Sequence, residues 1–293
     1  MIPEERARDL EARVGHPGDK WEALKEQVQS GAVQQFADIR DVWLDLMWTL
    51  DAYRIAAVPP RGMGNPQTSP ARRLDAIYRG KGNWFAEALA LLLQNRTSLR
   101  IAPRQRVQGF SQLHQIDLSW PARREDPLVC AETKVTGAPA YGTTPARSSL
   151  ADFVNRRKEL KFAATDLKLY RRQQDTAIEH WGVWRTHAPP KTYLLWAARI
   201  RPETDRLDRL LGEARALVDT YLDGAGVFGW VEAAAGPGYQ TIPVPHTERV
   251  SDLDDVLHRI ASEINLLAGP DRTVPPPVTP YERAVAPEDL TPD

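Results

Sequence analysis

The order of hydrophobic segments in the middle of the chain constrains the fold more than any other feature. An apolar helical pattern is followed by three strand-like runs, at 99–110, 113–120 and 128–135. Helical patterns then alternate with buried strands, at 145–174, 192–200, 205–223 and 227–231. Consecutive strands followed by crossover helices are typical of a mixed sheet covered on both faces. We therefore predict an α/β fold with a mixed central sheet flanked by helices.

The segments on either side of this region divide the 293-residue chain into three parts. The pattern predicts an N-terminal helical region and basic loop at 1–82, an α/β domain at 83–268 and a tail at 269–293. The last helix of the domain, 251–268, is expected to begin with a capping box of Ser251 and Asp254. The tail holds seven prolines, so we expect no regular structure there.

Composition excludes several classes of protein. Hydrophobic residues make up 42% and charged residues 26%, which are ordinary globular proportions. No apolar run is long enough to cross a membrane, and the N-terminus does not resemble a secretion signal. The single cysteine, Cys130, excludes a disulfide framework and fits a reducing cytoplasm. The net charge of -1 permits local basic patches, because an acidic site and a basic cleft cancel in the total.

The strand-like run LVCAETKV carries two charged side chains with one residue between them. Side chains alternate across a strand, so Glu132 and Lys134 share a face while Val129, Ala131 and Thr133 point the other way. Asp117 stands 15 positions before Glu132, on the preceding strand. A short turn between the two strands predicts a hairpin that brings the two carboxylates side by side.

Two adjacent carboxylates repel each other unless a proton or a cation lies between them. Hard oxygen ligands favour Mg²⁺, with Mn²⁺ as a substitute, and a nearby lysine can orient a water molecule. This combination suits hydrolysis of a phosphodiester. Glu87 is a candidate fourth member, because a carboxylate in the apolar helix at 84–94 needs a partner.

The succession of a helix bearing Glu87, a strand with QID, and a strand with AETK resembles the PD-(D/E)XK nuclease superfamily. The resemblance covers about residues 83–200, and Ile116 stands where the motif has proline. It implies a restriction-endonuclease-like core in which Asp117, Glu132 and Glu87 bind the metal and Lys134 positions the attacking water. The alternative is an exposed ion pair of Glu132 and Lys134, with Asp117 starting a turn and Glu87 accepting backbone hydrogen bonds.

Basic residues on both sides of this motif are candidates for contacts with nucleic-acid phosphates. Those predicted are Arg72, Arg73, Lys81, Arg156, Arg157 and Lys161. A solvated helix face is the competing interpretation for the last three. Trp181 and Trp184 are possible base-stacking residues, although tryptophans more often pack a core.

The sequence thus predicts a cytoplasmic, Mg²⁺-dependent endodeoxyribonuclease, and the expected class is a restriction or anti-phage defence enzyme. Double-stranded DNA is the favoured partner, and two cuts in a duplex favour a homodimer. A DNA-binding or assembly subunit with a nuclease-like fold, or an RNA-cleaving effector, are the alternatives. The sequence leaves the choice between DNA and RNA open.

Overall fold

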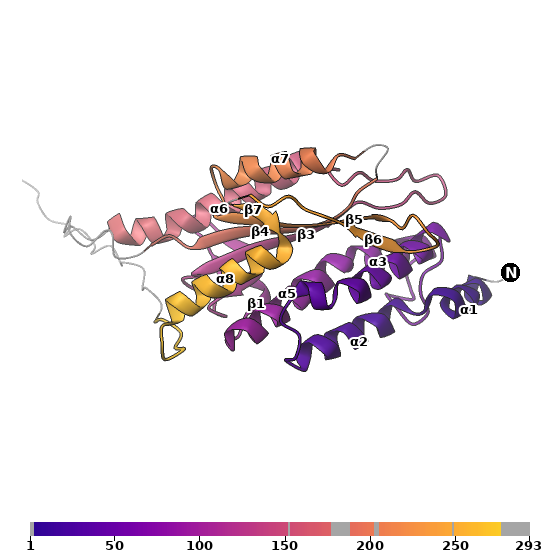
Figure 1. The fold of residues 1–293 in the computed structure, drawn as a ribbon, viewed down its shortest axis with the longest axis horizontal. Helices are drawn as coiled ribbons and strands as arrows, with labels where there is room; N and C mark the ends of the chain where they lie inside the picture. Colours follow the sequence, from indigo (N-terminus) through magenta and orange to yellow (C-terminus); the bar gives the residue numbers. More distant parts are fainter. Residues whose placement is uncertain (1–2, 152, 177–187, 202–204, 248, 277–293) are drawn as a thin grey trace, which may run out of the picture.

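A mixed sheet with helices on both faces forms the centre of the molecule (Figure 1). The computed structural model describes residues 3–151, 153–176, 188–201, 205–247 and 249–276. Among these residues the sheet has seven strands. The predicted α/β class, with its N-terminal helical addition, is therefore confirmed.

The strands follow the predicted order and are joined by two that the sequence pattern did not indicate. They are β1 (Ala102–Gln108), β2 (Leu113–Trp120), β3 (Val129–Thr136), β4 (Lys191–Arg199), β5 (Gly224–Glu232), β6 (Tyr239–Ile242) and β7 (Val250–Asp252). The unexpected strands β6 and β7 are short and lack a clear apolar alternation. Pairing with β5 makes them strands, and sequence periodicity does not report such pairing.

Helices precede the sheet and connect its later strands. They are α1 (Pro3–Val14), α2 (Pro17–Gln29), α3 (Arg40–Ile55), α4 (Pro70–Arg79), α5 (Lys81–Thr97), α6 (Phe153–Thr176), α7 (Leu207–Val218) and α8 (Leu253–Ala268), with a short 3₁₀ helix η1 (Phe36–Asp38). Among the described residues, no helix is both long and apolar enough to pass through a bilayer. The stretch that contains Trp181 and Trp184 lies outside the described residues, as does the tail after 276.

The pairing of the strands changes direction at β3. Strands β1, β2 and β3 form an antiparallel meander, whereas β3, β4 and β5 are parallel neighbours. The parallel connections run through α6 and α7, as crossover geometry requires. β3 is therefore the strand at which the meander meets the parallel half of the sheet.

Two apolar cores lie on opposite faces of the sheet. On one face, α2, α3, α5 and α8 pack around large buried rings such as Trp43 and Phe85. On the other, α6 and α7 cover β4 and β5, with Phe153 of α6 stacked on Trp196 at a centroid distance of 4.7 Å. Figure 1 shows α6 and α7 above the sheet and the N-terminal helices below it.

Two predicted helix starts are wrong. The helix expected from 145 begins at Phe153, because the preceding segment folds back on itself through the pairs Ala138–Arg147 and Tyr141–Thr144. Helix α8 is capped by Asp252, whose side chain accepts from the Asp254 N–H, and not by Ser251 and Asp254. Thr–Pro and Ser–x–x–Asp signals are local, and tertiary pairing overrides them here.

Candidate active site

Glu132 and Lys134 occupy the central strand at the change of sheet direction. Ala131, between Cys130 and Glu132, packs into the core on the α5 side. Cys130 instead packs with Leu167 of α6 on the other face, beneath Glu132. The alternation of the strand thus carries Glu132 and Lys134 to the α6 side, as their spacing predicts.

Asp117 is brought beside Glu132 by the register of β2 and β3. The registered pairs run from Trp120–Val129 to Leu118–Ala131, so Asp117 and Glu132 stand at the next position. Oδ2 of Asp117 accepts hydrogen bonds from the backbone N and from Oγ1 of Thr133, at 2.9 and 3.0 Å. The side chain of Asp117 therefore ties the two strands together where the three residues meet.

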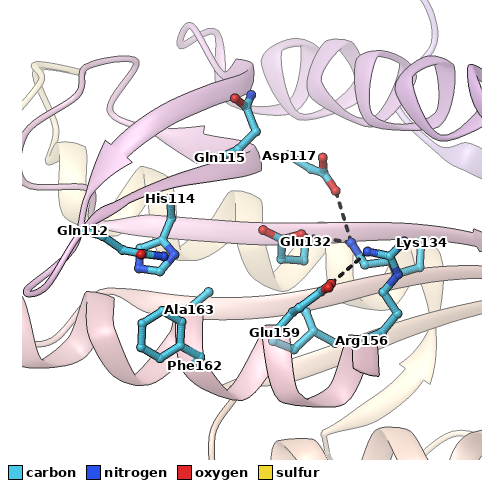
Figure 2. A pocket seen from close by; sticks show the side chains of 11 residues that line it. Gln112, His114, Gln115, Asp117, Glu132, Lys134, Arg156, Glu159, Phe162 and Ala163 are labelled. Atoms are coloured by element: carbon cyan, nitrogen blue, oxygen red, sulfur yellow. Dashed lines mark hydrogen bonds and ion pairs between the residues drawn. The ribbon is translucent and has the colours of Figure 1, made fainter. Parts of the chain in front are cut away.

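Lys134 closes the group of three charged side chains. Its Nζ lies 3.1 Å from Oε2 of Glu132 and 3.8 Å from Oδ2 of Asp117. Figure 2 shows the three side chains converging from β2 and β3. The predicted hairpin neighbours are thus brought together, and Lys134 stands between the two carboxylates.

The surroundings of Glu132 disfavour its charge. Burial raises the pKa of Glu132 to about 7, Lys134 opposes this rise, and the neighbouring Asp117 carboxylate adds to it. The apolar side chains beneath Glu132 supply the burial. Asp117 and Glu132 thus share one cation, Lys134, within ion-pair distance.

These residues form one wall of a cavity of about 330 Å³ between the sheet and α6. The strands and the β1–β2 turn supply Gln112, His114, Gln115, Asp117, Glu132 and Lys134, and α6 supplies Arg156, Glu159, Leu160, Phe162 and Ala163. Arg156 is half exposed, and its guanidinium donates to Glu159 at 2.8 Å. A cation thus faces the carboxylate wall from the opposite side of the cavity (Figure 2).

Glu87 does not belong to this group. It lies on α5, which packs on the other face of the sheet, and its Oε1 pairs with Nζ of Lys25 on α2 at 2.7 Å. Its side chain is 35% exposed, so it is not the buried, partnerless carboxylate that the apolar helix suggested. The expectation that Glu87 completes the centre is wrong, because packing against α2 supplied its partner.

Of the six predicted phosphate contacts, Arg156 is the one that lines the cavity. Arg157 instead pairs with Glu213 at 3.1 Å, and Lys161 lies over the ring of Tyr221 at 4.5 Å. Both therefore contact α7 or the turn after it. Neither Arg157 nor Lys161 lines the cavity that holds Asp117 and Glu132.

The other three predicted phosphate contacts, on α4 and at the start of α5, do not line the cavity. Arg72 and Arg73 belong to α4, which packs against α3 and α5. Lys81 is buried, donates to the carbonyl of Gly137 at 3.1 Å and lies over the ring of Tyr78. Its burial lowers the pKa of Lys81 to about 8. The expectation that Lys81 contacts a phosphate is therefore wrong, because the side chain is enclosed by protein.

Several side chains of the site were not among the predicted residues. Thr133 holds Asp117, and Glu159 holds Arg156. His114 lines the cavity and its Nε2 lies 2.7 Å from Oδ2 of Asp166, both side chains being buried. Neither a strand threonine nor a histidine 52 positions from its aspartate carries a signal in the sequence.

The donor set fits a magnesium ion bound through few protein ligands. Among the described residues, no group of three or more histidine, cysteine or carboxylate side chains is arranged to hold a metal. Mg²⁺ does not need such a cage, because it keeps several waters and is often bound by one or two carboxylates together with substrate phosphates. Asp117 and Glu132, at the wall of an open cavity, match that arrangement.

No protein-family model matches the chain, and neither a curated protein nor a solved structure matches it.

Proposed function

We propose that this protein is a metal-dependent endonuclease that hydrolyses phosphodiester bonds of DNA. The observation that carries the proposal is the convergence of Asp117, Glu132 and Lys134 at one wall of a cavity, with Arg156 on the other. Two carboxylates and a lysine on adjacent strands are also the pattern on which the resemblance to PD-(D/E)XK nucleases rests. We propose membership of that superfamily on the same residues.

Each residue has a role that its contacts support. Asp117 and Glu132 would hold the metal, with the hydrogen bonds from Thr133 orienting the Asp117 carboxylate. A bound Mg²⁺ would supply polarisation of the phosphoryl oxygen and stabilisation of the charge that develops there. Lys134 holds the attacking water, and Arg156 binds a phosphate oxygen while Glu159 keeps its guanidinium in place.

The remaining features of the proposal follow from the family resemblance, from the oxygen ligands and from the single cysteine. The substrate is DNA, duplex included, and Mn²⁺ substitutes for Mg²⁺. The protein acts as a homodimer in the cytoplasm, in restriction or another anti-phage defence. The DNA substrate, the homodimer and the defence role rest on analogy, whereas the phosphodiesterase chemistry rests on the residues of the cavity.

Variants of the three central residues test the chemistry. Asp117→Ala, Glu132→Ala and Lys134→Ala are incubated with plasmid, linear duplex, single-stranded DNA and RNA, with and without Mg²⁺. We expect cleavage by the wild type to require the metal. In each variant the cleavage rate should fall by orders of magnitude. Glu87→Gln is the matched control, because it alters a carboxylate outside the cavity and is expected to cleave as the wild type does.

The outcomes separate the alternatives. Cleavage that persists in all three variants, or without any divalent metal, contradicts the proposed site. A wild type that binds DNA and cuts no substrate under any metal supports a binding or assembly subunit instead. Cleavage confined to RNA would retain the site and change the substrate.

A further inference from the structure

The cavity has a second end, which differs in character from the carboxylate end. Figure 2 shows Asp117, Lys134 and Arg156 toward one side and Gln112, His114 and Phe162 toward the other, with Glu132 between them. The first side carries the charges. The second carries an aromatic ring, an imidazole and an amide, which are groups that can stack on a planar ligand or hydrogen-bond to its edge.

Phe162 presents an exposed aromatic ring to this end. It lies on α6, lines the cavity, and is 49% exposed. The ring of His114 packs edge-to-face against it at a centroid distance of 5.4 Å. Covering an exposed phenyl ring with a flat apolar surface is favourable, because it removes apolar area from water.

The support behind Phe162 is rigid. His114 is held by Asp166, whose other carboxylate oxygen accepts from both the backbone N and the Oγ of Ser111, at 2.9 and 2.8 Å. The same aspartate accepts, through its backbone carbonyl, from the N–H of Phe110 at 3.1 Å. Asp166 thus fixes the β1–β2 turn and His114 against α6, so the aromatic end is preorganised.

A second exposed ring lies on the segment that Asp166 holds. Phe110, in the β1–β2 turn, is 48% exposed. Gln112, two residues further on, lines the cavity and carries both a donor and an acceptor for the edge of a base. Aromatic faces beside a cation are the means by which proteins bind unpaired bases without sequence preference.

We propose that the aromatic end of the cavity, formed by Phe162, His114 and Gln112, binds the base of a nucleotide adjacent to the phosphate at the carboxylate end. The inference rests on the proposed nuclease function and specifies its substrate. A base can stack on Phe162 only after leaving the duplex, because its neighbours in the stack otherwise cover both of its faces. The preferred substrate is therefore single-stranded or locally unpaired DNA.

Binding measurements test this subsite separately from cleavage. In a Lys134→Ala background, which should bind without cutting, fluorescence anisotropy measures the affinity for a short labelled single strand and for a blunt duplex of the same sequence. We expect Phe162→Ala to weaken single-strand binding about tenfold, as loss of one stacked base would. Phe162→Trp should retain the affinity, and duplex binding should stay unchanged.

Leu169→Ala is the matched control, because Leu169 is an exposed apolar side chain of the same helix that does not line the cavity. The proposal is overturned if Phe162→Ala binds the single strand as tightly as Leu169→Ala does, or if it weakens single-strand and duplex binding equally. Absence of single-strand binding by the Lys134→Ala parent also overturns it. Cleavage by the wild type, lost in Asp117→Ala, would then show that only the stacking subsite has failed.

Discussion

At the scale of single residues, Thr133 decides how one carboxylate of the site is presented. Its backbone N–H and hydroxyl both donate to Oδ2 of Asp117, and its side chain is buried. Groups that orient a metal ligand without touching the metal typically contribute ten- to a hundredfold to affinity. Thr133 is therefore a positioning residue for the proposed site.

We expect Thr133→Val to lower the affinity for Mg²⁺ about tenfold, because it keeps the shape and removes the hydroxyl donor. Thr133→Ser should restore most of the affinity, since it keeps the hydroxyl. Isothermal titration with Mg²⁺ or Mn²⁺ measures both variants against the wild type. Equal affinities for wild type and Thr133→Val would show that the hydroxyl does not orient Asp117.

Asp166 is the second residue on which local structure depends. Burial raises the pKa of Asp166, but hydrogen bonds from His114 and Ser111 outweigh this and hold it below the ordinary value of 3.8. A carboxyl group whose pKa is lowered by folding stabilises the native state above its unfolded pKa. That contribution is lost as the pH falls through the folded pKa.

Asp166→Asn should therefore lower the free energy of unfolding by about 2 kcal/mol at pH 7, the worth of hydrogen bonds to a charged group. The difference between wild type and variant should shrink as the pH falls below 3.8, where the wild-type carboxylate becomes protonated. Urea denaturation at a series of pH values measures it. A gap that stays constant down to the acid transition would refute the assignment.

At the scale of elements, Asp254 joins the last helix to the N-terminal region. Its two carboxylate oxygens accept from the N–H groups of Phe36 and Ala37, at 2.7 and 2.8 Å, and one of them pairs with Arg96 at 2.7 Å. The residue expected to cap its own helix thus satisfies the first N–H groups of η1, 218 positions away. One side chain links α8, α5 and η1.

We expect Asp254→Ala to reduce the free energy of unfolding by about 2 to 3 kcal/mol. The substitution removes the acceptor for the N–H groups of Phe36 and Ala37 and the ion-pair partner of Arg96. Asp255→Ala is the control. Asp255 forms an exposed ion pair with His246 at 3.1 Å, so its loss should cost less than about 0.5 kcal/mol. Chemical denaturation of both variants measures the difference, and similar losses would contradict the bridging role.

At the scale of the whole molecule, the N-terminal helices and the sheet share one hydrophobic core. Trp21 stacks on Trp84 at a centroid distance of 5.6 Å, and Phe36 contacts both Phe85 and Phe228. The predicted boundary after residue 82 falls inside α5. The α/β part therefore buries one face against helices that the sequence assigned to a separate region.

A fragment of residues 81–276, which begins with α5, should fail to fold cooperatively, because it exposes the apolar face that α2 and α3 cover. The full chain should unfold in a single transition. Circular dichroism and thermal melting compare the two. A fragment that melts sharply near the midpoint of the full chain would show that the N-terminal helices are a separate unit.

Features that depend on neighbours along the chain could be predicted from the residues alone. Alternation along one strand places Glu132 and Lys134 on a common face whatever surrounds them. A short turn between two strands predicts Asp117 beside Glu132, and the pairing of Leu118 with Ala131 puts the two carboxylates at the next position. The order of helices and strands followed from periodicity in the same way, so the α/β class could be predicted.

Contacts between side chains that are distant in the sequence depend on how the elements pack. Glu87 looked buried because its helix is apolar almost all round, yet Lys25 of α2 pairs with it at a partly exposed position. Lys81 looked like a surface cation, yet Tyr78 of α4 and Gly137 after β3 contact its buried side chain. The packing of α6 on the sheet brings Asp166 within hydrogen-bonding distance of His114 and places Phe162 in the wall of the cavity. Burial and partners are set by contacts between distant segments, and a single sequence carries no record of those contacts.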